Sequence, residues 1–120
     1  MDIQKQITFL PTRDLNVTSK FYENILGLKL ILDQGDCRIY KTCSNAYLGF
    51  CEREFEIIKG KIILTLVVDD VENQYKVLSR NLSKGISDIV HNKKYNIIHF
   101  FVTDPNGYLV EIQKFLNPIE

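Results

Sequence analysis

The sequence contains one segment twice, and this repeat limits the possible folds more than any other feature. Residues 7–31, ITFLPTRDLNVTSKFYENILGLKLI, are echoed by residues 63–87, IILTLVVDDVENQYKVLSRNLSKGI. Each copy begins with an apolar run, continues through an acidic residue into a helical pattern, and ends near a glycine. Aligning Asp14 with Asp70 places Ile7 on Ile63. The repeat predicts two copies of one structural unit.

A second echo extends the unit beyond its helix. Residues 46–52, AYLGFCE, resemble residues 107–113, GYLVEIQ, and each forms the second arm of an expected hairpin. The predicted unit is therefore β-α-β-β-β. We expect a single domain over residues 1–120, with module one at about 3–52, a charged connector at about 53–60 and module two at about 61–116. Gly60 is the expected bend of the connector.

The helical patterns have the expected spacing and start signals. One apolar stripe is formed by Phe21, Ile25 and Leu28, and the other by Val71, Tyr75, Leu78 and Leu82. Asp69 and Glu72 have the spacing of a capping box at the start of the second helix. Gly27 stands where a helix commonly ends. Two amphipathic helices, each packing one face onto a sheet, give an α+β fold.

Composition and charge exclude several classes of partner. The 120 residues are 45% hydrophobic and carry 15 basic and 15 acidic side chains, so no net field attracts nucleic acid or an anionic membrane. No apolar run reaches the roughly 20 residues of a membrane helix, and the start is unlike a signal peptide. Cys37, Cys43 and Cys51 are odd in number and lack CxxC spacing. We therefore expect reduced thiols and a cytoplasmic protein.

Two motifs carry a family resemblance. Residues 13–30, RDLNVTSKFYENILGLKL, and residues 104–112, DPNGYLVEI, resemble the opening and closing signatures of the vicinal oxygen chelate superfamily, which includes glyoxalase I, bleomycin-resistance proteins and extradiol dioxygenases. The resemblance covers nearly the whole chain. It implies two βαβββ modules forming an open, barrel-like cleft, the glyoxalase/bleomycin-resistance fold. It also implies a homodimer with clefts shared between chains. Function differs among such proteins and must be argued from the site.

The resemblance places metal ligands on the first and last strand of each module. The matching residues here are Ile7, Ile63, Gly49 (or Phe50 if the strand register slips by one) and Glu111. One carboxylate is too few, since catalytic zinc uses about three protein ligands and the facial iron triad two histidines and a carboxylate. We therefore predict no metal and no cofactor. An atypical set with Gln6, rotated inward by a bulge, Glu111 and groups from a second chain is the alternative.

Strand parity, counted outward from two assumed turns, predicts the lining of the cleft. A turn at Thr42–Asn45 sets Arg38 opposite Gly49, and a four-residue DPNG loop sets Phe100 opposite Glu111. His99 then lies beneath the second helix. The predicted ligand-binding residues are Phe9, Arg38, Tyr40, Tyr47, Thr65, Phe100 and Glu111. Glu111 is either a salt-bridge partner of Arg38, a ligand contact, or a general base, and it is the one catalytic candidate.

Three functions remain open at this point. The first is a metal-independent small-molecule-binding protein of the bleomycin-resistance type, which sequesters an organic ligand in an aromatic cleft. The second is a metal-dependent lyase or dioxygenase, similar to glyoxalase I, with an atypical ligand set. The third is an accessory or interaction module without catalysis. The expected partners are a small-molecule ligand and a second copy of the chain, with no nucleic acid and no membrane.

Overall fold

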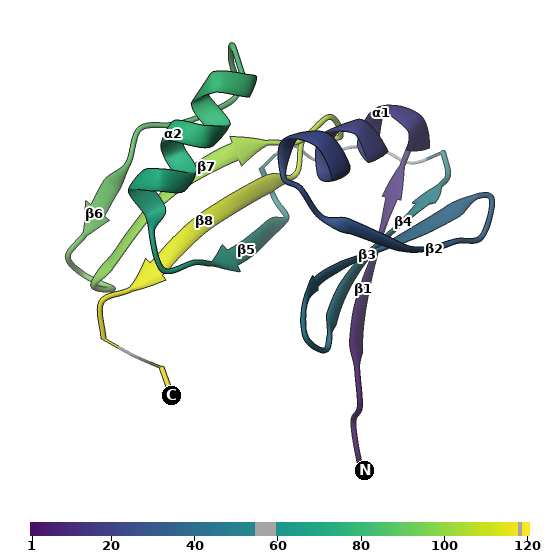
Figure 1. Cartoon of the computed structure of the whole chain (residues 1–120), viewed down its shortest axis with the longest axis horizontal. Coiled ribbons are helices and arrows are strands. Elements are labelled where there is room, and N and C mark those ends of the chain that lie inside the picture. The colour runs from purple at the N-terminus through teal and green to yellow at the C-terminus, as the bar shows by residue number, and fades with distance from the viewer. Residues whose placement is uncertain (55–59, 118) are drawn as a thin grey trace. The chain divides into compact units, whose positions relative to one another are not determined.

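The chain forms two compact units, Met1–Ile57 and Ile58–Glu120. The computed structural model describes residues 1–54, 60–117 and 119–120. The first unit contains β1 (Gln6–Thr12), α1 (Leu15–Lys20), the π-helical turn η1 (Phe21–Ile25), β2 (Lys29–Asp33), β3 (Cys37–Cys43) and β4 (Ala46–Glu52). The second contains β5 (Ile63–Val67), α2 (Val71–Asn81), β6 (Val90–Asn92), β7 (Ile97–Thr103) and β8 (Leu109–Phe115) (Figure 1). The predicted β-α-β-β-β repeat is confirmed.

Each unit builds one four-stranded sheet with the same topology. The strand order is β1-β4-β3-β2 in the first sheet and β5-β8-β7-β6 in the second. The first and last strands of each unit pair in parallel, and the remaining pairs are antiparallel. The predicted connector falls largely on residues 55–59, which lie outside the described residues. Gly60, the expected bend, lies in a turn at φ 72°, a conformation that favours glycine.

Both helices start at the aligned aspartates. The side chain of Asp14 accepts a hydrogen bond from the Val17 amide, and Asp70 accepts one from Asn73. The capping residue of α2 is therefore Asp70, and the prediction of a capping box starting at Asp69 is wrong by one position. The first helix ends through η1, and Gly27 follows at φ 74°. No helix among the described residues is long and apolar enough to cross a membrane.

The hydrophobic core of each unit lies between its helix and one face of its sheet. In the first unit Tyr22 packs against Phe50 with ring centroids 4.4 Å apart, and both are fully buried. In the second unit Phe100, only 1% exposed, meets Tyr75 of α2 edge-on at 5.2 Å. We call this side of each sheet the helix face. Because side chains alternate along a strand, the other residues form what we call the open face.

The two hairpins differ from their predicted registers by one residue each. Arg38 pairs with Phe50 rather than Gly49, because the register shifts between Lys41 and Cys43. Phe101, not Phe100, pairs with Glu111. One extra residue on either arm moves every side chain of that strand to the opposite face.

The second difference has a local cause in the DPNG turn. The turn includes Tyr108, whose backbone amide donates to the Asp104 carboxylate while its carbonyl accepts from the Asp104 amide. The same carboxylate accepts from the Asn106 amide at 2.8 Å. Gly107 takes φ 90°, a conformation that favours glycine. Tyr108 therefore belongs to the loop and is the residue that the predicted four-residue turn lacks, so Thr103 pairs with Leu109.

Candidate functional site

The second unit carries a polar cluster on the open face of its sheet, centred on Glu111. Thr65 Oγ1 of β5 donates to Glu111 Oε1 at 2.6 Å. His99 Nδ1 of β7 lies 2.6 Å from Oε2, and Gln113 Nε2 of β8 donates to the same oxygen at 3.3 Å. Glu111 is 9% exposed. The carboxylate is thus largely withdrawn from water but has three hydrogen-bond partners, as a buried carboxylate requires.

The topology of the sheet brings these side chains together. β8 lies between β5 and β7, with Thr65 opposite Glu111 on one side and Phe101 opposite it on the other. His99 is opposite Gln113, two residues farther along β8 and therefore on the same face as Glu111. Three strands thus contribute to one cluster. The prediction that His99 packs beneath the helix is wrong, and its cause is the one-residue error in the hairpin.

Phe101 joins this cluster to a surface pocket. Its ring meets the His99 ring edge-on, with centroids 5.2 Å apart. Phe101 also lines a pocket of about 360 Å³, together with Gly85, Ile86, Ser87, Thr103 and Leu109. A ligand seated in this pocket would share an aromatic wall with His99.

The first sheet has the same four positions, filled with different chemistry. Phe9 pairs with Gly49 as Thr65 pairs with Glu111, and Cys37 pairs with Cys51 as His99 pairs with Gln113. The strand pairing therefore makes Gly49, and not Phe50, the counterpart of Glu111. A Cβ atom at Gly49 would overlap the Phe9 ring, which lies over the glycine. In the first unit the polar cluster is therefore replaced by the Phe9 ring, which lies over Gly49, and by the side chains of Cys37 and Cys51.

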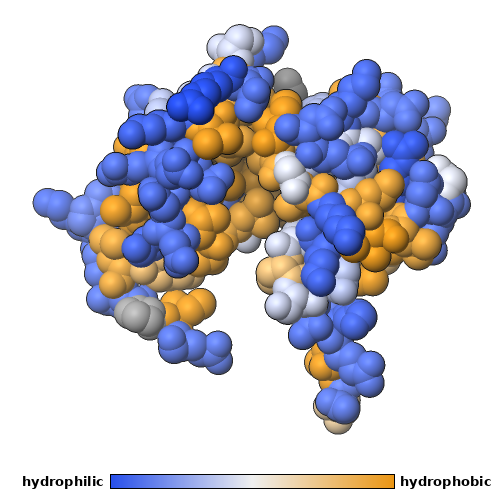
Figure 2. Space-filling view, viewed as in Figure 1, coloured by the Kyte–Doolittle hydropathy of each residue, from blue (hydrophilic) through white to orange (hydrophobic). Residues whose placement is uncertain are grey.

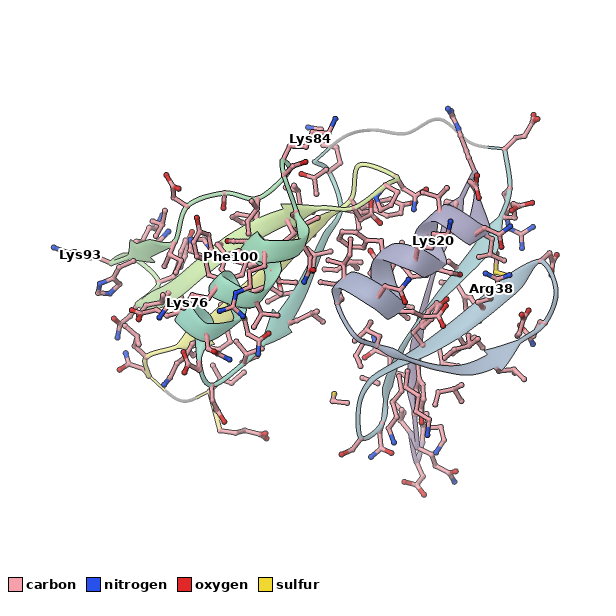
Figure 3. All side chains as sticks on the ribbon, turned by 45° about the horizontal axis from the view of Figure 1, so that its top comes forward. Lys20, Arg38, Lys76, Lys84, Lys93 and Phe100 are labelled. Atoms are coloured by element: carbon pink, nitrogen blue, oxygen red, sulfur yellow. A yellow bond between two sulfur atoms is a disulfide. The ribbon has the colours of Figure 1, made fainter. Side chains whose placement is uncertain are left out.

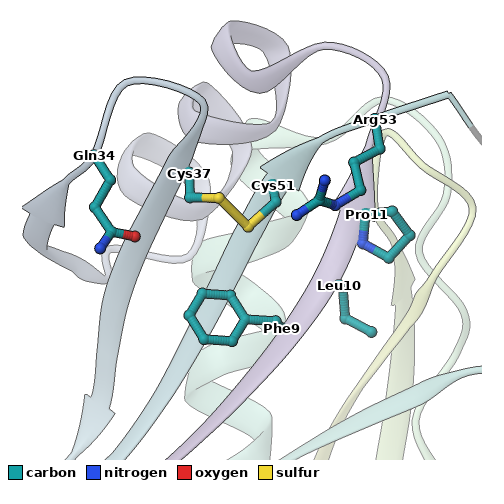
Figure 4. Close-up of a pocket in the computed structure, with 7 residues that line it drawn as sticks. All are labelled: Phe9, Leu10, Pro11, Gln34, Cys37, Cys51 and Arg53. Atoms are coloured by element: carbon teal, nitrogen blue, oxygen red, sulfur yellow. A yellow bond between two sulfur atoms is a disulfide. The ribbon is translucent and has the colours of Figure 1, made fainter.

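Phe9, Cys37 and Cys51 line a pocket in the first unit that is larger than the one beside Phe101. It measures about 460 Å³ and is lined by Phe9, Leu10, Pro11, Gln34, Cys37, Cys51 and Arg53 (Figure 4). Most of these groups are apolar, and the guanidinium of Arg53 and the amide of Gln34 are the polar exceptions. A mainly apolar pocket of this size with a few polar groups is typical of small-molecule sites. Of the seven residues, Phe9 alone belongs to the predicted ligand-binding set.

Cys37 and Cys51 form a disulfide, so the prediction of three reduced thiols is wrong. The two residues face each other across β3 and β4, with Cα atoms 4.1 Å apart. The predicted hairpin register would have placed Cys37 opposite Phe50 instead and hidden this pairing. Cys43, the third cysteine, is free and exposed.

Three predicted ligand-binding residues lie on the helix face instead of the open face. Arg38 donates to Ser19 Oγ at 2.6 Å and pairs with Asp33 at 3.4 Å. Tyr40 is fully buried, and Phe100 lies beneath α2 (Figure 3). The side-chain contacts do not support the predicted pairing of Arg38 with Glu111, because Arg38 points toward α1 and contacts Ser19 and Asp33. Glu111 has its own hydrogen-bond partners on the open face of the second sheet. Phe9, Tyr47, Thr65 and Glu111 lie on the open faces, as parity predicted.

Tyr40 is held by hydrogen bonds beneath the first helix. Its hydroxyl donates to Glu23 Oε2 at 2.9 Å, and the hydroxyl oxygen lies within hydrogen-bond distance of Ser19 Oγ, at 2.8 Å. Burial is the main cause that raises the pKa of this phenol above its ordinary value, and the nearby Glu23 carboxylate adds to the effect. These contacts give Tyr40 a structural role in the first unit.

The residues at the positions of the family's metal ligands do not fit a divalent cation. Ile7, Gly49 and Ile63 carry no donor atom in their side chains, and both oxygens of Glu111 already accept hydrogen bonds. β1 pairs with β4 in one continuous register, so Gln6 lies on the opposite face from Ile7 and the proposed bulge is not formed. Among the described residues, no three His, Cys, Asp or Glu side chains are grouped to hold a metal ion.

The chain is similar to known proteins over most of its length. Residues 4–112 match the model of the Glyoxalase/Bleomycin resistance protein/Dioxygenase superfamily. The chain is 28% identical to the uncharacterized protein YwbC of Bacillus subtilis (strain 168), in an alignment that covers 87% of this chain and 91% of that protein.

Solved structures share the fold at low sequence identity. A bleomycin resistance determinant encoded on the transposon Tn5 has a TM-score of 0.77 at 20% identity, covering 96% of this chain and all (100%) of that chain. Lactoylglutathione lyase from Agrobacterium tumefaciens has 0.73 at 18%, covering 90% of each chain. A bleomycin-binding protein from Streptomyces verticillus, complexed with copper(II)-bleomycin, has 0.75 at 16%, covering 93% of this chain and 96% of that chain. The predicted fold is confirmed.

Proposed function

The chain belongs to the Glyoxalase/Bleomycin resistance protein/Dioxygenase superfamily, and on that premise we propose that it binds a small organic molecule without a resident metal ion. The observation that carries the proposal is the chemistry of the four metal-ligand positions. Three of these residues have no metal-ligating atom in their side chains, and the fourth, Glu111, is hydrogen-bonded to Thr65, His99 and Gln113. These four side chains therefore offer a dehydrated divalent cation too few ligand atoms to replace its bound water.

The pocket of the first unit supports a binding role. Its apolar wall suits an organic ring system, and the Arg53 guanidinium offers charge-assisted hydrogen bonds to a carboxylate or phosphate substituent. No hydrogen bond joins the Arg53 side chain to another described residue, which supports a role for it as a ligand contact. We propose Phe9 as the stacking residue and Arg53 as the orienting one. Tyr47, partly exposed on the same face, remains a predicted ligand contact.

Proteins of this fold that bind bleomycin supply a first probe. Isothermal titration with metal-free bleomycin and with copper(II)-bleomycin would measure binding to the purified chain. We expect Phe9→Ala to weaken binding by about tenfold, which corresponds to about 1.4 kcal/mol of lost stacking and apolar contact. Arg53→Ala should weaken binding of an anionic ligand similarly, while Arg80→Ala, on the exposed surface of α2, serves as its matched control.

Metal content tests the other half of the proposal. The chain would be purified from cells grown with added nickel, zinc, manganese and iron, and its bound metal measured by mass spectrometry. We expect far less than one ion per chain. One stoichiometric ion that disappears in Glu111→Gln would overturn metal independence and would favour a lyase or dioxygenase.

We also propose that two copies of the chain associate. Several apolar side chains on the open faces are exposed, among them Ile7 (41%), Phe9 (51%), Ile63 (51%) and Val67 (58%), and hydrophobic residues reach the surface of both units (Figure 2). Covering such side chains with a second copy would remove apolar area from water. Sedimentation equilibrium should give the mass of a dimer, and Val67→Lys should shift it toward the monomer. A monomer at high concentration would contradict the proposal.

A further inference from the structure

Glu111 fixes the orientation and the tautomer of His99. A carboxylate offers only acceptors, so the nitrogen that lies 2.6 Å from it, Nδ1, carries a proton. In a neutral imidazole the other nitrogen, Nε2, then has a free lone pair. Thr65 and Gln113 hold the carboxylate from two further directions, so Glu111 cannot turn away without losing other hydrogen bonds.

The second imidazole nitrogen is not engaged by the part of the chain that the structure describes. Nε2 of His99 makes no hydrogen bond with any residue in the described ranges, and the side chain is 14% exposed on the open face. A histidine held on one nitrogen by a carboxylate, with the other nitrogen unengaged, has the arrangement that positions a general base. A packing role alone would not require the second nitrogen to be left free.

We propose that His99 Nε2 accepts the proton of an acidic hydroxyl group, a phenol or enol, on a ligand bound at the open face of the second sheet. Glu111 acts as the positioning residue. The proposal deepens the proposed binding function and rests on it. The surroundings of His99 favour this class of ligand, because Phe101 both contacts the imidazole ring and lines the 360 Å³ pocket. An aromatic or enolic ring in that pocket would pack on Phe101.

The step is a proton transfer, and its charges balance. The O–H bond of the ligand breaks, its electron pair stays on the oxygen, and a new N–H bond forms at Nε2. The resulting imidazolium lies between two negative groups, the carboxylate of Glu111 and the bound phenolate or enolate, and is attracted to both. No oxidant, reductant or metal ion takes part.

4-Nitrophenol is a suitable probe, because its phenolate absorbs at longer wavelength than its phenol. At a pH about one unit below the pKa of the free phenol, about a tenth of the free probe is ionised. We expect the bound probe to be mostly phenolate, a severalfold gain in the phenolate absorbance. His99→Gln should remove that gain, while His91→Gln, at the exposed second histidine, should leave it unchanged.

4-Nitroanisole, which has no proton to lose, separates the two proposals. If neither compound binds in equilibrium dialysis, both the phenol site and binding at this face are overturned. If both bind and the bound nitrophenol remains a phenol, the role of His99 is overturned while binding stands. If the gain in phenolate survives His99→Gln, a different acceptor takes the proton and the proposal also fails.

A measurement without ligand tests the positioning role of Glu111. Long-range ¹H–¹⁵N spectra of the imidazole ring distinguish a proton on Nδ1 from one on Nε2. When neutral, His99 should carry its proton on Nδ1, and Glu111→Gln should lose that preference while circular dichroism still reports a folded chain. A predominant Nε2–H tautomer in the unaltered protein would overturn the proposal.

Discussion

Phe100 and Phe101 are neighbours in the sequence but lie on opposite faces of the second sheet, and exchanging each for alanine tests the register on which the site rests. Phe100 is 1% exposed and packs on Tyr75 of α2, whereas Phe101 is half-buried on the open face beside His99. Removing a fully buried phenyl ring costs about 3–5 kcal/mol, from lost transfer energy and the cavity left behind. Phe101→Ala should cost about 1 kcal/mol, because the ring is only partly removed from water.

Urea unfolding followed by far-ultraviolet circular dichroism measures the difference, since the chain has no tryptophan to report by fluorescence. With a slope of about 2 kcal/mol per molar urea, Phe100→Ala should lower the unfolding midpoint by about 2 M and Phe101→Ala by about 0.5 M. If Phe100→Ala does not fold, Phe100→Leu and Phe101→Leu give the same ordering with smaller shifts. An equal or reversed ordering would refute the register, and with it the placement of His99 beside Glu111.

Further predictions follow from other contacts. Replacing both Cys37 and Cys51 with serine should lower the free energy of unfolding by about 3 kcal/mol, the value expected for a disulfide that closes a loop with the observed separation of 14 residues. Thiol labelling of the native chain should find one free cysteine, Cys43. Unchanged stability together with three labelled thiols would contradict the disulfide. Because the pKa of Tyr40 is raised in the folded chain, the Tyr40 phenol loses its proton at lower pH in the unfolded chain than in the folded one. The contribution of Tyr40 to the free energy of unfolding is therefore fully present below pH 10 and falls as pH rises above it. Tyr40→Phe should reduce this loss of stability at alkaline pH and leave the loss due to Tyr108, whose pKa is also raised by burial. If Tyr40→Phe does not change how the free energy of unfolding depends on pH, Tyr40 is excluded as a source of the loss.

The repeat, the helices and the strands could be predicted because each depends on local patterns. The two aligned aspartates begin both helices, and the hairpins form where turn residues separate apolar runs. The candidate site could be predicted only in part, since the face that a side chain occupies depends on the exact length of a turn. In both hairpins the observed pairing differs by one residue from the predicted pairing, because of an irregularity near Thr42 and a longer turn that ends at Tyr108.

These single-residue errors account for most of the differences at the site. The predicted registers put Arg38, Tyr40 and Phe100 on the open face and His99 beneath a helix, whereas the observed registers reverse all four placements. Phe9, Thr65 and Glu111 lie on the open faces as predicted, because their parity follows from the metal-ligand positions that the family resemblance implies, Ile7, Ile63 and Glu111, and does not depend on the length of a turn. The prediction of reduced thiols rests on the odd number of cysteines and the lack of CxxC spacing, and neither feature reports which cysteines face each other across a hairpin. Cys37 and Cys51 are opposite only in the observed register.

The comparison of the two units explains why a carboxylate occurs at one open face and not at the other. Matching the letters of the repeat would set Glu111 against Phe50, but the strand pairing sets it against Gly49. At Glu111 three donors surround the carboxylate, whereas a glutamate at Gly49 would meet the Phe9 ring and a disulfide, neither of which donates a hydrogen bond to it.

A desolvated carboxylate without donors costs several kcal/mol, so the carboxylate and its donors must occur together. The duplicated fold therefore has equivalent positions in both units, but their side chains differ. They form an apolar surface in the first unit and a cluster around a hydrogen-bonded histidine in the second. This difference is the strongest reason to look for ligand chemistry at His99 and for apolar contact at Phe9.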